Sequence, residues 1–176
     1  RKRREKKGMT LETAKATLMS DPRYFAAMLV HQERVDGMVA GSSSPTAHVL
    51  RAAIHIIGPK EGLKTVSSSF IMITNTPEFG DNGTFIYADG GVIPNPTAMQ
   101  LADIAISSAE KARKTVGMKE PKVAFLSFST KGSADGESVT KVREAIEILK
   151  ERNVDFEFDG EFQLDAAIVP EVAKSN

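Results

Sequence analysis

The chain has 176 residues, 41% of them hydrophobic, which is enough for a buried core in one domain or one and a half. Its 23 basic and 23 acidic residues balance, so no overall charge attracts nucleic acid, and no apolar run approaches the ~20 residues of a membrane span. Cysteine is absent, which excludes disulfides and thiolate catalysis and suits a reducing compartment such as the cytoplasm. Because the chain begins at Arg1 rather than Met, we expect it to be a piece of a longer protein.

The first 31 residues predict two helices after a basic run. Residues 1–7 hold six basic side chains, a pattern more typical of a solvated helix end than of a nucleic-acid-binding arm. Thr10 is expected to cap a helix over 11–19, and Asp21 to cap a second one that begins at Pro22. Phe25, Met28 and Leu29 recur at helical spacing on the second helix and predict its core face.

The stretch 35–57 predicts a buried strand over 35–40, a Gly/Ser turn, and a helix from Pro45 to Ile57. Ser43 or Ser44 fits the N-cap of that helix, and Pro45 fits its first position. Three hydroxyl groups before a helix N-terminus, with Arg51 two turns later, suggest a phosphate site. The spacing alone leaves the commoner alternative open, an ordinary β-α connection with a surface arginine.

This helix has one apolar face and one polar face. His48, Arg51 and His55 share the polar face, where two histidines are more often surface residues than acid–base catalysts. Gly58 is expected to end the helix, and the run from Gly58 to Gly62 is the best linker in the chain.

Beyond the linker, strands alternate with helices. Four apolar residues from Phe70 to Ile73 predict a strand covered on both faces. Asn95 is expected to cap a long helix that begins at Pro96, Asp159-Gly160 to form a turn, and Asp165 to cap the last helix. The expected strands are 66–74, 84–89, 122–129 and 154–158, and the expected long helices are 96–116 and 137–152.

This alternation indicates an α/β fold, with helices on both sides of a mostly parallel sheet in three α/β/α layers. Ligands of such folds bind at the carboxyl ends of strands, where both Gly/hydroxyl turns, 42–46 and 129–133, are expected. The sequence has no P-loop, no G-x-G-x-x-G and no G-x-S-x-G. Its three histidines have no partners at recognised metal spacing, so no metal site is expected.

Six stretches together resemble the phosphate acetyltransferase family, and the likeness covers essentially the whole chain. They are K-G-M-T at 7–10, D-G-M-V-A-G at 36–41, T-A-H-V-L-R at 46–51, N-P-T-A at 95–98, L-S-F-S-T-K-G-S at 126–133 and D-G-E-F-Q-L-D-A-A-I-V-P at 159–170. Each alone would be a weak signal, whereas the set is highly specific.

The resemblance implies acetyl transfer between phosphate and coenzyme A, which is a substrate, so that no separate cofactor is expected. It implies a homodimer of two-domain subunits with a cleft, a fold like that of isocitrate and isopropylmalate dehydrogenases. Residues 1–61 would belong to the first domain and 62–176 to most of an inserted second domain. It makes Arg51 the catalytic residue, and it implies substrate binding by Arg4, Ser42, Ser43, Ser44, Thr46, Thr130, Lys131, Gly132 and Ser133.

The sequence departs from the family pattern at several points. His48 stands where the family usually has Asp, Ala52 replaces a proline, and Gly90-Gly91 varies a D-C-[AG] stretch. The family's D-L-S-R-G stretch, whose serine handles the CoA thiol with a nearby aspartate, lies beyond Asn176. We therefore expect the phosphate half of the site here, and no activity from the fragment alone. A phosphate butyryltransferase and a non-catalytic domain that senses acyl-CoA or phosphate are the alternatives.

Overall fold

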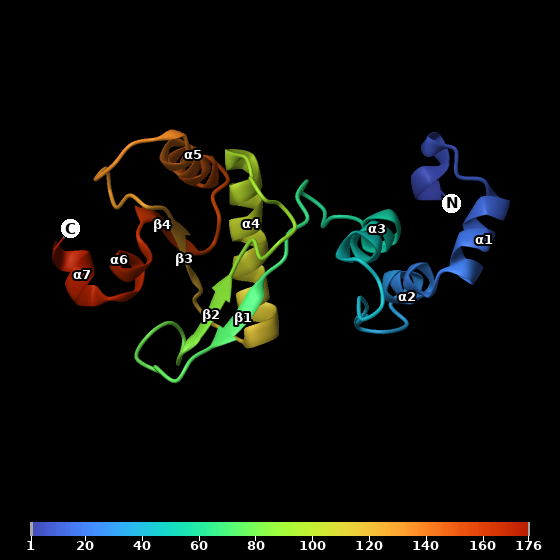
Figure 1. Ribbon diagram of the computed structural model, residues 1–176, viewed down its shortest axis with the longest axis horizontal. Helices are drawn as coiled ribbons and strands as arrows, with labels where there is room; N and C mark the ends of the chain where they lie inside the picture. Colours follow the sequence, from blue (N-terminus) through green and yellow to red (C-terminus); the bar gives the residue numbers. More distant parts are fainter. Residues whose placement is uncertain (1, 176) are drawn as a thin grey trace. The chain divides into compact units, whose positions relative to one another are not determined.

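The computed structural model describes the backbone of residues 2–175 and the side chains of residues 4–174 (Figure 1). Arg1, the first residue of the basic run, lies outside the described residues. The chain divides into two compact units, residues 1–62 and 63–176. That these are parts of a first domain and of a second, inserted domain stays a prediction. No helix within residues 2–175 is both long and apolar enough to cross a membrane.

The first unit is helical over its described residues. It contains the 3-10 helix η1 (Lys2–Lys7), α1 (Leu11–Ser20), α2 (Pro22–His31) and α3 (Thr46–Ile56). Both predicted caps are confirmed: Thr10 Oγ1 accepts from the Thr13 backbone N at 3.1 Å, and Asp21 Oδ1 accepts from the Arg23 backbone N at 2.9 Å. Gly58 follows the end of α3 with a φ of +79°, a left-handed conformation that glycine adopts easily because it has no side chain, and it ends the helix as predicted.

Three expectations for this unit are wrong. Residues 35–40 form no strand, and Val39 is fully exposed, because this segment has no partner strand among the described residues to pair with its backbone. Pro45, with ψ 143°, is itself the N-cap of α3, and neither Ser43 nor Ser44 caps it. Phe25 is 52% exposed, because the buried contact of α2 is made by the small Ala27 instead.

The second unit holds four strands in two separate sheets. β1 (Phe70–Ile73) pairs antiparallel with β2 (Thr84–Tyr87), and β3 (Lys122–Leu126) pairs parallel with β4 (Glu157–Phe162). Its helices are α4 (Ala98–Lys111), the π-helix η2 (Ala112–Val116), α5 (Glu137–Glu151), α6 (Leu164–Ile168) and α7 (Pro170–Ser175). The α/β class and the parallel pairing are confirmed, whereas the β1–β2 pair is antiparallel, since residues 74–83 between the two strands are fewer than a parallel crossover needs.

The core of this unit lies where α4 and α5 pack on the parallel pair. The helical period of the sequence predicts that Val139, Val142, Ile146 and Leu149 of α5 face inward, and all four are buried, Val139 and Leu149 completely. Gly160 in β4 comes so close to Phe125 in β3 that a Cβ at residue 160 would lie 2.8 Å from the Phe125 Cβ. The core cluster joins Ala102 and Ala105 of α4, Phe125 of β3, and Val142, Ala145, Ile146 and Leu149 of α5.

Local predictions at four places in this unit are wrong. Thr97 caps α4 in a reciprocal capping box with Gln100, while Asn95 instead accepts a hydrogen bond from Lys141. The predicted strand 66–74 pairs only over Phe70–Ile73, and those four side chains are exposed rather than covered.

The other two errors lie near the C-terminal end. Asp159 and Gly160 continue β4 instead of turning, because residues 157–162 pair with β3. Gln163, not Asp165, is the N-cap of α6.

Candidate functional site

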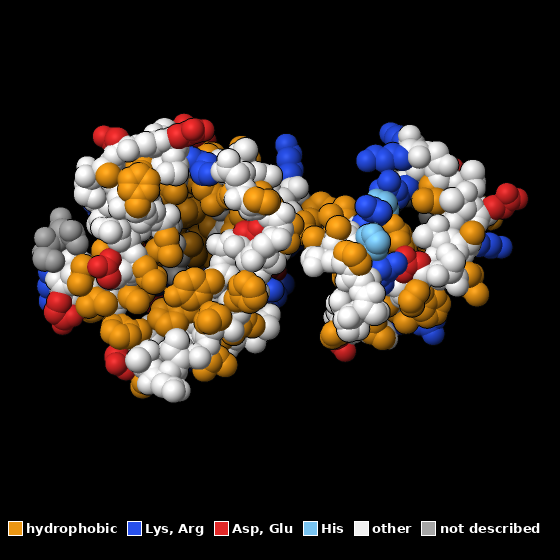
Figure 2. Space-filling model, viewed as in Figure 1, with side chains coloured by type: hydrophobic (Ala, Val, Ile, Leu, Met, Phe, Trp, Pro, Cys, Tyr) orange, Lys and Arg blue, Asp and Glu red, His pale blue; other side chains and the backbone are white. Residues whose placement is uncertain are grey.

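Three basic side chains of the first unit form a cluster around one imidazole. His55 of α3 lies near Arg4 and Lys7 of η1 and near Arg51, one turn before it on α3. We call Arg4, Lys7, Arg51 and His55 the basic cluster. Figure 2 shows Lys and Arg side chains gathered around histidine side chains on this unit. The fold thus brings together two of the residues assigned from the sequence, Arg4 and Arg51, from segments 47 positions apart.

The surroundings of His55 disfavour its charged form. Burial lowers the pKa of His55 below its ordinary value, and the charges of Arg4, Arg51 and Lys7 lower it further. Its Nδ1 lies 2.9 Å from the hydroxyl oxygen of Tyr24 on α2. His55 therefore binds a proton less readily than a free imidazole does.

Arg51 is exposed and has no ion pair among the described residues, so its guanidinium is available to an anion. His48, on the same helix, is also exposed, and its Nδ1 lies 3.4 Å from Nη1 of Arg23. Ser42, Ser43 and Ser44 stand in the turn before α3, and their side chains make no hydrogen bond in the part of the chain that is described. Thr46 is the first residue of the helix.

The second hydroxyl turn, Ser129–Ser133, is organised by a buried carboxylate that sequence reasoning missed. Glu161 of β4 is 3% exposed and accepts from Ser129 Oγ at 3.0 Å and from the Gly132 backbone N at 2.8 Å. The Arg143 guanidinium donates to it from α5, with Nη2 at 3.0 Å and Nε at 3.2 Å. These hydrogen bonds lower the pKa of Glu161 to about 2, and the one from Arg143 has the largest effect.

The four predicted residues of this turn are brought together, but each has a partner inside the unit. Thr130 is buried and accepts from the Gln163 backbone N at 2.9 Å, while Ser133 Oγ accepts from the Thr130 backbone N at 2.9 Å. Lys131 pairs with Asp159, and its ammonium lies 4.9 Å from the centre of the Phe162 ring. The turn is therefore a preformed loop at the carboxyl end of β3, as predicted.

Two further carboxylates of the second unit, the buried Asp103 and the half-buried Asp89, bind backbone N atoms of the same unit. Asp103 accepts from the backbone N atoms of Lys64 and Thr65 and from Arg152, and Asp89 accepts from Ser68 and from the Val92 backbone N. Burial raises the pKa of both carboxyl groups, but the hydrogen bonds that they accept outweigh this effect, so each pKa is lowered. Within the described residues no three His, Asp or Glu side chains gather into a metal site.

The whole sequence, residues 1–176, matches the family described as phosphate acetyl/butaryl transferase. The chain belongs to this family. A phosphate acetyltransferase of Treponema pallidum is 53% identical over 175 residues, covering 98% of this chain and 52% of the relative. One of Acetivibrio thermocellus is 49% identical over 172 residues, covering 98% and 51%.

Solved structures give the same result for the fold. A phosphotransacetylase from Streptococcus pyogenes superposes with a TM-score of 0.83 at 43% identity, covering 96% of this chain and 50% of that one. The chain therefore spans about half the length of the relatives that it matches. The family match confirms the resemblance that the six sequence stretches indicated.

Proposed function

We propose that the full-length protein containing this chain transfers an acetyl group between phosphate and coenzyme A, and that this chain supplies the phosphate half of the site. The observation that carries the proposal is the convergence of Arg4 and Arg51 in one exposed basic cluster of a phosphate acetyltransferase family member. Two guanidinium groups are suited to a phosphoryl group, since each offers a planar fork of donors to two oxygens.

In this mechanism the CoA thiolate attacks the acetyl carbonyl carbon of acetyl phosphate. The carbonyl oxygen becomes an oxyanion, and its collapse breaks the bond to the phosphate oxygen, which leaves with the electron pair. Arg51 stabilises the negative charge on the departing phosphate and is the catalytic residue. Arg4 and the hydroxyls of Ser42, Ser43, Ser44 and Thr46 bind the remaining phosphoryl oxygens.

The turn 130–133 is proposed as a second substrate-binding segment. Thr130, Lys131, Gly132 and Ser133 follow the carboxyl end of β3, where ligands bind in α/β folds. The ion pair between Lys131 and Asp159 of β4 is exposed, so the Lys131 ammonium can be reached by an anionic group of the substrate.

The rest of the proposal concerns the whole protein. Coenzyme A is a substrate, no further cofactor and no metal take part, and no nucleic acid or membrane partner is involved. The full-length enzyme is a homodimer in the cytoplasm. A serine and an aspartate outside this chain activate the thiol, so the 176-residue chain alone is inactive.

The test is an assay of the full-length protein with CoA and either acetyl phosphate or butyryl phosphate. We expect acetyl-CoA formation, with the higher kcat/KM for acetyl phosphate, and none from the 176-residue chain alone. A higher kcat/KM for butyryl phosphate would make the protein a butyryltransferase. Tight binding of either substrate without turnover would indicate a sensing domain instead.

A further inference from the structure

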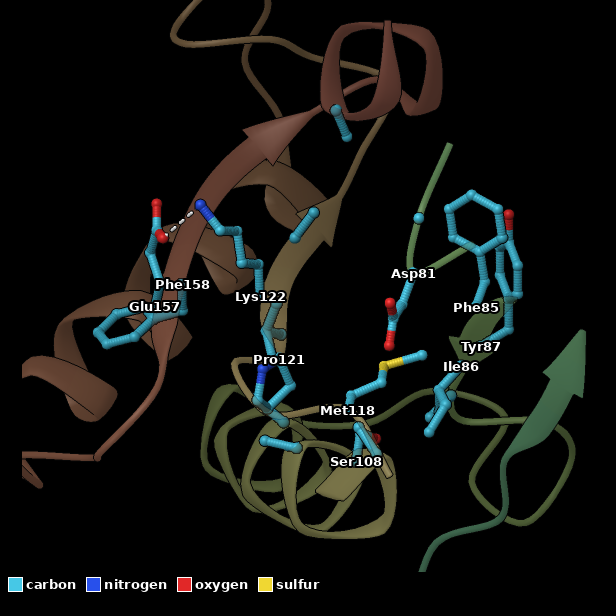
Figure 3. A pocket seen from close by; sticks show the side chains of 18 of the residues that line it. Asp81, Phe85, Ile86, Tyr87, Ser108, Met118, Pro121, Lys122, Glu157 and Phe158 are labelled. Carbon is cyan, nitrogen blue, oxygen red and sulfur yellow. Dashed lines mark ion pairs between the residues drawn. The ribbon is translucent and has the colours of Figure 1, made fainter. Parts of the chain in front are cut away.

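The two sheets of the second unit face each other across an apolar gap. A cavity of about 1260 Å³ lies between β2 and β3 and is lined by every residue of both strands. We call this cavity the inter-sheet gap. Figure 3 shows Phe85, Ile86 and Tyr87 of β2 on one side of it, and Lys122 at the start of β3 on the other.

Both strands that border the gap present an edge with no strand paired to it. β2 pairs with β1 on one side, β3 pairs with β4 on one side, and no other strand joins either sheet in residues 2–175. Such an edge leaves a row of backbone N–H and C=O groups ready for another strand. Isolated two-stranded sheets are marginally stable, so these pairs gain by joining a larger sheet.

The gap is also covered on its two faces by helices. α4 lines it with Leu101, Ile104 and Ala105, and α6 lines it with Leu164 and Ala167. In Figure 1, β3 and β4 lie between these two helices. A strand in this position would be buried on both faces, which selects a continuous apolar run instead of an alternating one.

Large apolar side chains around the gap remain accessible to water. Tyr87, Leu126 and Leu164 line it and are 37%, 43% and 44% exposed. Most of the lining is apolar, and the charged residues that line the gap include Asp81 and also Lys122 of β3, which pairs with Glu157 of β4 at 2.7 Å (Figure 3). The gap is therefore lined mainly by apolar side chains that water still reaches, which fits a hydrophobic peptide segment better than a charged metabolite.

We propose that the inter-sheet gap receives a β-strand of about five mostly apolar residues from the part of the full-length protein that follows Asn176. Pairing with β2 and β3 at once, the strand joins the two pairs into one five-stranded sheet. Its length follows from β3, which has five residues, at ~3.3 Å for each residue of a strand.

Two observations select this occupant. The relatives are about twice as long as this chain, so each carries polypeptide that the chain does not cover. Among the described elements, the late helix α6 already lines the gap, whereas residues 1–62 form the other unit. Connections between neighbouring elements are usually short, which favours the polypeptide after α7 over that before residue 1.

Hydrogen exchange of backbone amides tests the proposal without any use of catalytic activity. Three proteins are compared: the 176-residue chain, the chain with all that follows Asn176 in the full-length protein, and the chain with all that precedes Arg1. We expect the amides of β2 and β3 to exchange at least ~10-fold more slowly in the second protein alone, as an unpaired edge becomes a paired strand.

A matched pair of variants locates the effect in the gap. Ile86 lines the gap, while Ile71 stands directly opposite it on β1 and does not. In the C-terminally extended protein, Ile86→Asp should remove the slow exchange of β3, and Ile71→Asp should leave it in place, with far-UV circular dichroism of both variants as the folding check. Equal exchange of the β2 and β3 amides in the three proteins would overturn the proposal. Slower exchange caused by the segment that precedes Arg1 would also overturn it. So would protection in the 176-residue chain that rises with protein concentration, because this would indicate that a second copy of the chain occupies the gap.

Discussion

The two hydroxyl-rich turns have similar sequences but opposite constructions. The 42–46 turn exposes most of its hydroxyls, has no side-chain cap, and follows a segment without a partner strand. The 129–133 turn is hydrogen-bonded to Glu161 of β4, which also binds Arg143 of α5, and Ser129 is fully buried. The comparison teaches that the sequence of a Gly/Ser turn does not determine how firmly the turn is held. A carboxylate about 30 residues away, Glu161, accepts hydrogen bonds from one turn, whereas no described side chain binds the other in this way.

The largest expected effect tests the exposed side of this comparison. In the full-length protein, Arg51→Ala should lower kcat and kcat/KM by ~10²–10³, the usual loss for a donor that stabilises developing charge. Arg51→Lys should recover only part, because an ammonium is a point charge without the planar fork. Steady-state kinetics with each substrate varied in turn gives the result.

The control for Arg51 is His48→Ala, one turn earlier on α3, where we expect a smaller effect. The KM for CoA should change little in either variant, because the thiol half of the site lies elsewhere. A rise in the KM for acetyl phosphate with unchanged kcat would reduce Arg51 to a ground-state binding residue. A folded Arg51→Ala enzyme with normal kinetic constants would remove it from the site.

The next effect tests the buried side. Glu161→Gln should destabilise the 176-residue chain by roughly 2–4 kcal/mol, because Arg143 loses its charged partner in a buried network. Glu147→Gln is the matched control, since Glu147 is exposed and pairs only with Lys150, and its effect should stay within ~0.5 kcal/mol. Urea unfolding followed by far-UV circular dichroism measures the free energy of unfolding of both variants. Equal losses of stability would show that Glu161 does not organise the turn.

The same carboxylate should make stability depend on pH. The pKa of Glu161 is about 2, below its ordinary 4.5, so ionised Glu161 stabilises the fold above pH 4.5, and this stabilisation is lost as pH falls toward 2. The shift corresponds to about 3 kcal/mol. The stability difference between the wild-type chain and Glu161→Gln, measured by urea unfolding at several pH values, should shrink over this window. A difference that stays constant from pH 7 to pH 3 would contradict the assignment.

The smallest effects compare two helix starts. Thr97→Ala should cost about 1 kcal/mol, because it removes the cap of α4 and breaks the capping box with Gln100. Ser44→Ala, before α3, should change stability by less than ~0.5 kcal/mol, because Ser44 caps nothing. Urea midpoints of the two variants give the comparison, and a cost of 1 kcal/mol for Ser44→Ala would show that the turn is capped after all.

The sequence by itself determined the features that depend on neighbouring residues. Thr10 and Asp21 cap their helices because a cap needs only the backbone two or three positions ahead. The inward residues of α5 were predictable because the helical period places them on one face. The family was recognisable because six short stretches each keep their order and composition along the chain.

Only the tertiary structure decided the features that depend on distant partners. Residues 35–40 have the composition of a strand, yet a strand exists only where another backbone pairs with it. Glu161 had no pattern to mark it, because its partners Ser129, Gly132 and Arg143 lie 18 to 32 residues away. Arg4 and Arg51 joined one cluster for the same reason: the packing of η1 against α3 brings them to His55, and no local spacing in the sequence expresses that contact.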